Sequence, residues 1–228
     1  MAIAIDANSS SHQADVTTPT LAHTCTGSNR GLYVLAALRD PGSGFSITGV
    51  TYNSVAMTQE NFIDQTAGPG DQFYCSFWSL ENPASGTNNI QVTYSAEVDD
   101  ALFGGISLTG VDQTDSTEAS VEASGNDATP TINVTTVSAN AMVVDGMADF
   151  GDATTITEGA GQTLGWEISV GAQFPSGAQS TEPKVTPGSV TMSWTLNEGN
   201  VWNIFAVSVK PAAGISIPVV YHHRQRNF

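Results

Sequence analysis

Charged side chains are scarce in this chain, making up 12% of its 228 residues, and lysine occurs at only two positions. No stretch shows the 3.6-residue periodicity of an amphipathic helix, and strong helix formers other than alanine are few. Glycine, serine, threonine and asparagine are abundant, and these residues favour turns and strands over helices. The composition therefore argues against a helical protein and predicts an all-β fold.

Long apolar runs and an export leader are also lacking. No run reaches the roughly 18 apolar residues that a membrane-spanning helix needs, so we expect no membrane partner. The first residues, MAIAIDANSSSHQADV, carry no positive charge ahead of an apolar core. We therefore expect a protein that is made in the cytoplasm and carries no Sec signal.

Cysteine is nearly absent as well. The two cysteines, Cys25 and Cys75, lie fifty residues apart in strand-like contexts, LAHTCT and FYCSFW. A bridge between them would be permitted in an oxidising compartment, but in a cytosolic product such residues are more often free. We predict two buried, reduced thiols that behave as small apolar side chains.

Known catalytic and metal-binding motifs are missing. There is no HExxH, GxSxG or P-loop pattern, and no histidine is spaced with the cysteines as zinc ligands are; the histidines are His12, His23, His222 and His223. Several acids gather in predicted loops: Glu97, Asp99, Asp100, Asp112 and Asp115. They leave a paired-carboxylate hydrolase or a calcium site open, without the spacing of an EF-hand. Because such loops are usually solvated turns, we expect neither an enzyme nor a cofactor.

Charge is divided unevenly along the chain. All 22 acids lie at or before Glu198, where there are three bases, so this part carries a formal charge of −19. Residues 199–228 hold Lys210, Arg224 and Arg226 and no acid, a charge of +3. A body this acidic repels phosphate, so we expect it not to bind nucleic acid.

The stretch from Gly188 to Pro211 is the clearest structural signal. Its first run alternates apolar Val190, Met192, Trp194 and Leu196 with short hydroxyl residues, which predicts a half-buried strand. The turn Asn197–Asn200 follows, and Val201–Val209 is then apolar on both faces. We predict a hairpin whose second strand is covered on both sides.

Similar patterns occur elsewhere and suggest an internal repeat. Residues 82–110 resemble a shortened version of this hairpin, and Leu32–Leu38 resembles Ala141–Met147. Residues 112–129, by contrast, are expected to form a long exposed connection. The pattern predicts about ten to twelve antiparallel strands, either as two small sandwiches, 1–112 and 130–211, or as one domain, 1–211, which the short loops favour.

The four tryptophans raise the question of sugar binding, because flat rings stack on pyranose faces. Trp194 and Trp202 lie on apolar faces and are expected to pack in the core. Trp166 follows a glycine-rich loop and is the residue expected to be exposed and able to contact a glycan.

The end of the chain, 212–228, differs from the rest. An apolar segment leads into the basic, aromatic sequence YHHRQRNF. It predicts either a frayed edge strand or an arm that docks on a neighbouring acidic subunit. The residues proposed for such an arm are Ile217, Val219, Tyr221, His222, His223, Arg224, Arg226 and Phe228.

Several segments together resemble a known kind of module. These are SNRGLYVLAAL, GFSITGVTYNSVAMT, FWSLENPASGTNNIQVTYS, GGISLTGVDQT, GSVTMSW and FAVSVKP. Over residues 20–211 the pattern is similar to the jelly-roll-type β-sandwich modules of bacteriophage virion proteins and of some bacterial surface proteins. It contains no catalytic motif.

The resemblance implies a virion structural protein, either a capsid decoration protein or a tail-associated subunit. Its partners would be copies of itself and other virion proteins, and it would act through contacts between subunits. The alternative is a carbohydrate-binding module for a surface polysaccharide. A hydrolase acting through Asp99 and Asp100 is a third hypothesis.

Overall fold

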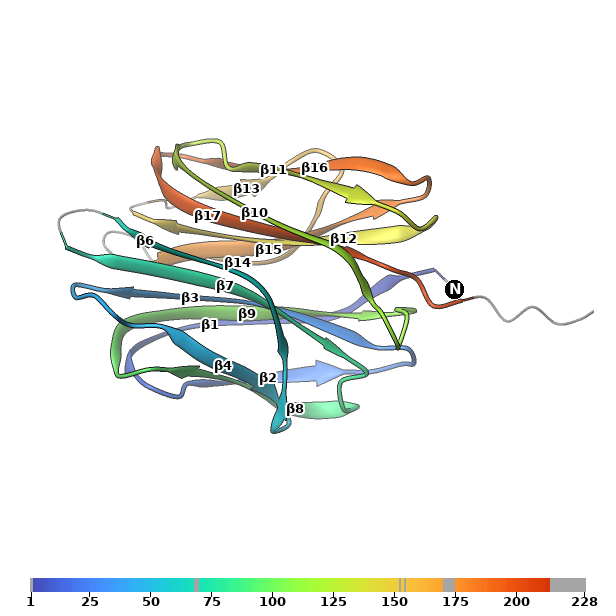
Figure 1. Cartoon of the computed structure of the whole chain (residues 1–228), viewed down its shortest axis with the longest axis horizontal. Helices are drawn as coiled ribbons and strands as arrows, with labels where there is room; N and C mark the ends of the chain where they lie inside the picture. Colours follow the sequence, from blue (N-terminus) through green and yellow to red (C-terminus); the bar gives the residue numbers. More distant parts are fainter. Residues whose placement is uncertain (1, 68–69, 152, 154, 170–174, 214–228) are drawn as a thin grey trace, which may run out of the picture.

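The computed structural model describes residues 2–67, 70–151, 153, 155–169 and 175–213, and every regular element in this part is a β-strand (Figure 1). The predicted all-β sandwich is confirmed, with seventeen strands instead of ten to twelve. They are β1 (Ala4–Val16), β2 (Thr20–Cys25), β3 (Gly31–Asp40), β4 (Ile47–Tyr52), β5 (Val55–Ala56), β6 (Thr58–Thr66), β7 (Gln72–Glu81), β8 (Gly86–Tyr94), β9 (Val98–Thr109), β10 (Thr117–Asp127), β11 (Thr131–Thr136), β12 (Ala141–Phe150), β13 (Ile156–Glu158), β14 (Thr163–Ile168), β15 (Pro175–Lys184), β16 (Gly188–Leu196) and β17 (Asn200–Val209). The described residues contain no helix that could span a membrane.

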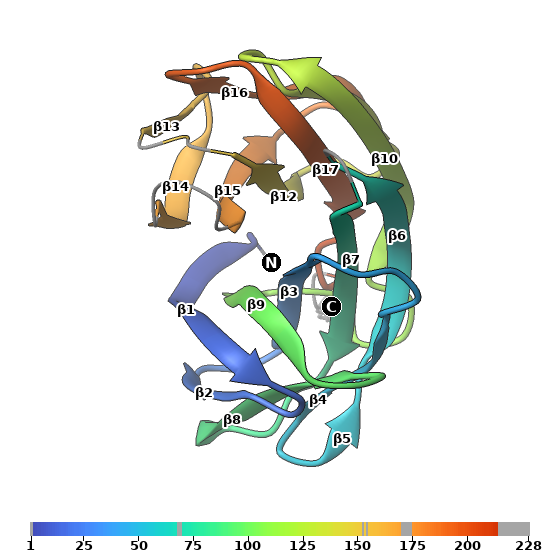
Figure 2. The same cartoon turned by 90° about the vertical axis from the view of Figure 1, so that its left-hand side faces the viewer.

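The strands form four antiparallel sheets stacked in layers (Figures 1 and 2). The two inner sheets have five strands each, in the orders β1-β9-β3-β7-β6 and β10-β17-β12-β15-β14. A four-stranded sheet, β2-β8-β4-β5, covers the first, and a three-stranded sheet, β11-β16-β13, covers the second. The chain thus builds two sandwiches, one on the other.

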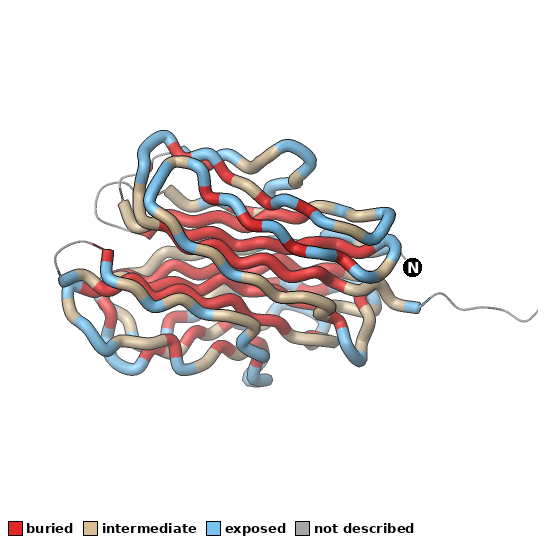
Figure 3. The backbone as a smooth tube through the Cα atoms, turned by 45° about the horizontal axis from the view of Figure 1, so that its top comes forward, coloured by how far each residue is buried: buried red, intermediate tan, exposed pale blue. Residues whose placement is uncertain are grey.

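Three apolar cores separate the four layers. In the central core the Phe77 ring stacks on the Phe205 ring, with centroids 6.2 Å apart, which joins the two inner sheets. Alternation along β3 sends Leu35 into this core and Val34 into the outer one. The interior strands of the inner sheets are therefore buried on both faces, which explains the nearly continuous apolar sequences of β3, β12 and β17 (Figure 3).

The two halves repeat one topology. If β1–β4 and β6–β9 are matched in order with β10–β17, each strand occupies the same place in its sheets, and β5 alone has no counterpart among the described strands. The resemblances seen in the sequence fall on matching strands: β8–β9 with β16–β17, and β3 with β12. The two strands predicted from Gly188 to Pro211 are β16 and β17, and the second is buried on both faces as expected. The predicted hairpin is wrong, because β16 pairs with β11 and β13 in the outer sheet whereas β17 pairs with β10 and β12 in the inner one. The half-buried β16 covers one side of the outer core, and β17, apolar on both faces, lies between the outer and central cores.

Residues 112–129 are not the exposed connection that the sequence suggested. Most of the stretch is β10, which pairs with β17 from Thr117↔Val209 to Asp127↔Asn200. Its inward positions hold Ala119, Val121 and Ala123, which pack against the outer core while remaining partly exposed. Small residues on an edge strand give a weak alternation, which in the sequence resembles a loop.

Candidate functional site

The two halves meet at a seam where the edge strands β6 and β10 lie side by side (Figures 1 and 2). The side chain of Asn61, on β6, bridges the seam to β10. The amide oxygen of Asn61 accepts hydrogen bonds from the Ser120 hydroxyl (2.6 Å) and the Val121 amide (3.3 Å), and its NH2 group donates to the Glu60 carbonyl (2.8 Å). Strands that are sixty residues apart in the sequence are thereby held together.

Two adjoining hollows follow this seam. The larger, of about 440 Å³, is lined by Thr58, Glu60, Ser79, Leu80, Glu81, Asp115, Ser116 and Thr117. The other, of about 390 Å³, is lined by Gln59, Glu60, Asn61, Phe62 and Glu122. Because Glu60 lines both, we treat them as one feature and call these residues the seam groove.

The seam groove is acidic. Glu60 accepts hydrogen bonds from the hydroxyls of Ser79 (2.5 Å) and Thr117 (3.1 Å), so both halves of the chain hold it in place. Glu81 accepts a hydrogen bond from the Ser116 amide (2.6 Å). Asp115 and Glu122 are exposed. Among the described residues that line the groove there is no lysine, arginine or histidine.

A buried phenol lies beneath the larger hollow. Tyr33 is 1% exposed, and its hydroxyl has no hydrogen-bond partner of normal geometry among the described residues. Burial raises the pKa of Tyr33 above its usual range, and Glu60 and Glu81 raise it further, whereas Ser116 lowers it. All three of these neighbours line the groove, whereas Tyr33 itself is buried in the central core and is not one of the lining residues.

The second hollow presents an aromatic ring to solvent. Phe62 is 53% exposed, and its ring stacks on that of Tyr74 with centroids 5.6 Å apart. Since most aromatic side chains of this protein are buried, an exposed ring beside carboxylates gives the groove a surface on which a planar cation can stack.

The opposite seam, between β1 and β14, is filled by Trp166, so the expectation that Trp166 is exposed was wrong. Trp166 is 5% exposed, and its indole nitrogen donates to the Gln179 side chain (2.7 Å). Its ring lies against Gly104, where a Cβ atom would be 2.5 Å from the ring. A buried ring cannot stack on a sugar. The sequence signal was Gly104 itself, which admits a bulky neighbour.

The other tryptophans are buried too. Trp194 and Trp202 pack in the outer core of the second half, which confirms their predicted role. Trp78 packs in the outer core of the first half. Among the described residues, the large exposed aromatic side chain is therefore Phe62 and not a tryptophan.

Asp100, a candidate for hydrolytic chemistry, is buried in an ion-pair network. Its carboxylate lies 3.3 Å from both Arg39 and His12, and burial raises its pKa. Arg39 also pairs with Asp71 (3.1 Å) and lies over the Phe150 ring of the second half. The neighbouring Asp99 points to solvent. The two carboxylates of the hydrolase hypothesis therefore lie in different environments, and Asp100 holds strands together.

His23 also belongs to the interior. Ser9 lies 2.8 Å from its Nδ1 atom, and burial lowers the pKa of His23 to about 4 although the Asp6 charge raises it. The other ring nitrogen is buried without a hydrogen-bond partner among the described residues. His23 is thus neutral near pH 7, and no described carboxylate bonds its second ring nitrogen as the third member of a catalytic triad would.

Both cysteines are free and buried, as predicted. Cys25 lies in the outer core of the first half and Cys75 in the central core. Burial raises the pKa of each thiol. In the described part of the chain, no three His, Cys, Asp or Glu side chains are placed to hold a metal ion.

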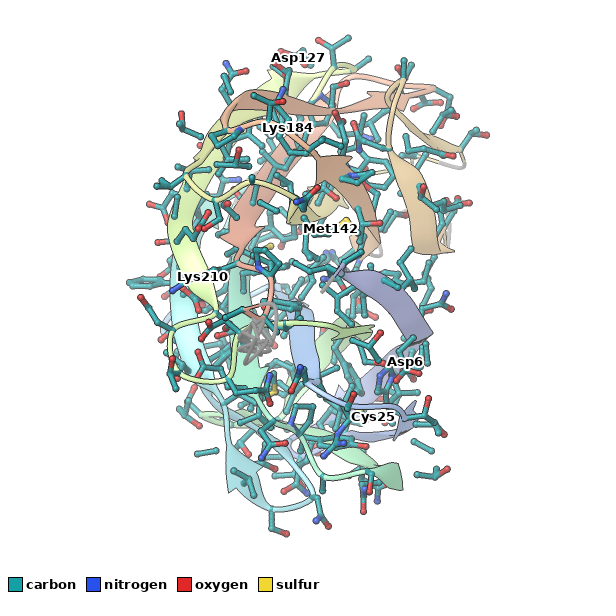
Figure 4. The ribbon with its side chains drawn as sticks, turned by 90° about the vertical axis from the view of Figure 1, so that its right-hand side faces the viewer. Asp6, Cys25, Asp127, Met142, Lys184 and Lys210 are labelled. Carbon is teal, nitrogen blue, oxygen red and sulfur yellow. The ribbon has the colours of Figure 1, made fainter. Side chains whose placement is uncertain are left out.

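The chain leaves the body beside the seam groove. Lys210 donates its backbone amide to the Ser116 carbonyl (2.8 Å), and its ammonium lies 3.9 Å from Asp112. Figure 4 places Lys210 where β10 and β6 come together. Ala212 donates to the Gly110 carbonyl (2.7 Å). The predicted arm residues, from Ile217 to Phe228, lie outside the described residues.

Comparisons with known proteins give no information about this site, which we therefore interpret from its residues. No family model, curated protein or solved structure matches this chain.

Proposed function

We propose that this protein is a non-enzymatic structural subunit that assembles with copies of itself. The observation that carries the proposal is the division of charge. The body is strongly acidic and keeps an acidic groove open on its surface, and the chain becomes basic where it leaves the body beside that groove. Opposite charges on one molecule, at different places, favour association between copies.

The setting that we propose is a bacteriophage virion, with the protein as a capsid decoration or tail-associated subunit. Support comes from the resemblance of residues 20–211 to virion sandwich modules. The structure of residues 2–213 also suits a rigid structural subunit. Its two sandwiches share a central core, and polar side chains such as Asp145 and Asp100 connect neighbouring strands. A rigid body with an extending arm is a common design for subunits that lock together.

Sedimentation velocity tests the proposal. The full chain is expected to form a larger species as its concentration rises, and a variant lacking residues 214–228 is expected to remain a single copy. This truncation leaves intact the hydrogen bond that the Ala212 amide donates to the Gly110 carbonyl. A full chain that sediments as one copy at every concentration would overturn the proposal, and so would equal association of both chains.

A carbohydrate-binding module is the second candidate, favoured by one hollow on the outer face of the four-stranded sheet. It measures about 380 Å³ and is lined only by hydroxyl and amide side chains: Thr20, Thr51, Asn53, Ser54, Thr87, Asn88, Asn89 and Gln91. Such groups donate to and accept from sugar hydroxyls. Glycan-array binding that is lost in Asn89→Ala/Gln91→Ala but kept in Asn133→Ala, on the other outer sheet, would support this candidate.

A further inference from the structure

We propose that the seam groove is the receptor for the basic C-terminal segment, residues 221–228, of a second copy of this chain. The inference rests on the proposed self-assembly and names the two surfaces that meet.

Charge complementarity is the first argument. The groove offers the carboxylates of Glu60, Glu81, Asp115 and Glu122, with no basic side chain among its described lining residues. The segment YHHRQRNF offers two arginines and no acid. Guanidinium groups bind carboxylates through paired, directional hydrogen bonds, so arginine suits this groove better than a simple cation does.

The second argument is the exposed ring beside the carboxylates. Phe62, 53% exposed, lines the second hollow together with Glu60 and Glu122 and offers a face for an arginine or an aromatic side chain. A ring next to carboxylates matches the arginines and aromatic residues of the segment, because a guanidinium can stack on the ring while it pairs with an acid.

The geometry permits exchange between two copies. The chain leaves the body beside Ser116, at one end of the groove, so the arm and its receptor lie on the same side of the molecule. Two copies related by a two-fold axis would each place an arm next to the groove of the other. Residues 214–228 span at most about 50 Å when extended, enough to cross from one copy to the next.

A charge-swap experiment in the full chain tests the inference. The groove variant is Asp115→Arg/Glu122→Arg, at two exposed acids that can be replaced without removing a buried contact. The arm variant is Arg224→Glu/Arg226→Glu. The control, Glu97→Arg/Glu198→Arg, makes the same change of net charge at exposed sites away from the groove.

Each variant alone is expected to associate at least about tenfold more weakly than the wild type, because like charges then face each other. Association is expected to return when the groove and arm variants are mixed, since the unlike surfaces then belong to different chains. The control should associate as the wild type does. Circular dichroism spectra establish that each variant is folded.

Three outcomes would overturn the inference. If the groove variant associates normally while removal of residues 214–228 abolishes association, the arm binds another surface and the proposed function stands. If the two variants do not associate when mixed, exchange between copies is wrong. If the wild type does not associate at all, the proposed function fails together with the inference.

Discussion

The buried carboxyl of Asp145 is predicted to make the stability of the protein depend on pH. Asp145 lies on β12 and is fully buried. One of its oxygens accepts hydrogen bonds from the amide and hydroxyl of Ser180 (2.9 and 2.7 Å), and the other accepts one from the indole of Trp194 (2.7 Å). Burial outweighs these bonds and raises the pKa of Asp145 from 3.8 to about 7.

The sign follows from proton binding. Between about pH 4 and pH 7 the folded state keeps a proton on Asp145 that the unfolded state has lost, so the free energy of unfolding falls as pH rises. A shift of this size corresponds to about 4 kcal/mol across that range, at 1.36 kcal/mol per pH unit. His23 acts in the opposite direction, because its pKa is lowered to about 4 and the unfolded state binds the extra proton below about pH 6.5.

The perturbation is Asp145→Asn, which keeps the shape of the side chain and removes its titration. Urea unfolding followed by tryptophan fluorescence, from pH 4 to pH 7.5, measures the difference in stability between the wild type and D145N. The wild type is expected to lose about 4 kcal/mol relative to the variant as pH rises. The His23→Gln variant serves as a control, since its difference from the wild type should run the other way. A D145N difference that is constant with pH would refute the reasoning.

Three further predictions concern the contact of Gly104 with Trp166, the ion pairs of Arg39, and the burial of the two thiols. Gly104→Val places a Cβ atom 2.5 Å from the Trp166 ring and 2.8 Å from the Ser9 carbonyl, and should lower stability by about 2 kcal/mol or more in thermal melts, whereas Gly49→Val, with open space around it, should not. Arg39→Met removes the arginine that pairs with both Asp100 and Asp71 and should cost about 3 kcal/mol at neutral pH; an unchanged urea midpoint would contradict this role. Neither Cys25 nor Cys75 should react with a maleimide in the folded protein, and both should react in denaturant; rapid labelling of the native chain would contradict their burial.

Strong alternation made much of the fold predictable. The two strands between Gly188 and Pro211 and the apolar strand Ala141–Phe150 were placed from the sequence almost to the residue, because each has apolar side chains along its buried faces. The pairing of β16 with β17 as a hairpin was wrong, since the pattern along a strand does not say which sheet the strand joins. The strand β10 escaped prediction because its inward positions hold alanine and a single valine. Weak periodicity leaves an edge strand indistinguishable from a loop.

The seam groove could not be predicted for a related reason. It is assembled from β6, β7 and residues 115–122, and of its acids only Asp115 was considered from the sequence, as part of a solvated loop, because β10 was predicted to be a loop. Trp166 was misjudged because local glycines suggested exposure, whereas the ring fills a gap above Gly104 on a strand sixty residues away. Such contacts between the halves depend on how the sheets stack, which alternation along one strand does not reveal.

The most direct test of the account is a cross-link from the groove. The photoreactive residue p-benzoylphenylalanine replaces Phe62 in the full chain, and ¹⁴N- and ¹⁵N-labelled chains are mixed before irradiation. The account predicts cross-links from position 62 to residues 221–228, with mass spectra that show the two peptides coming from differently labelled chains. Cross-links confined to a single chain, or made to other parts of the body, would contradict it.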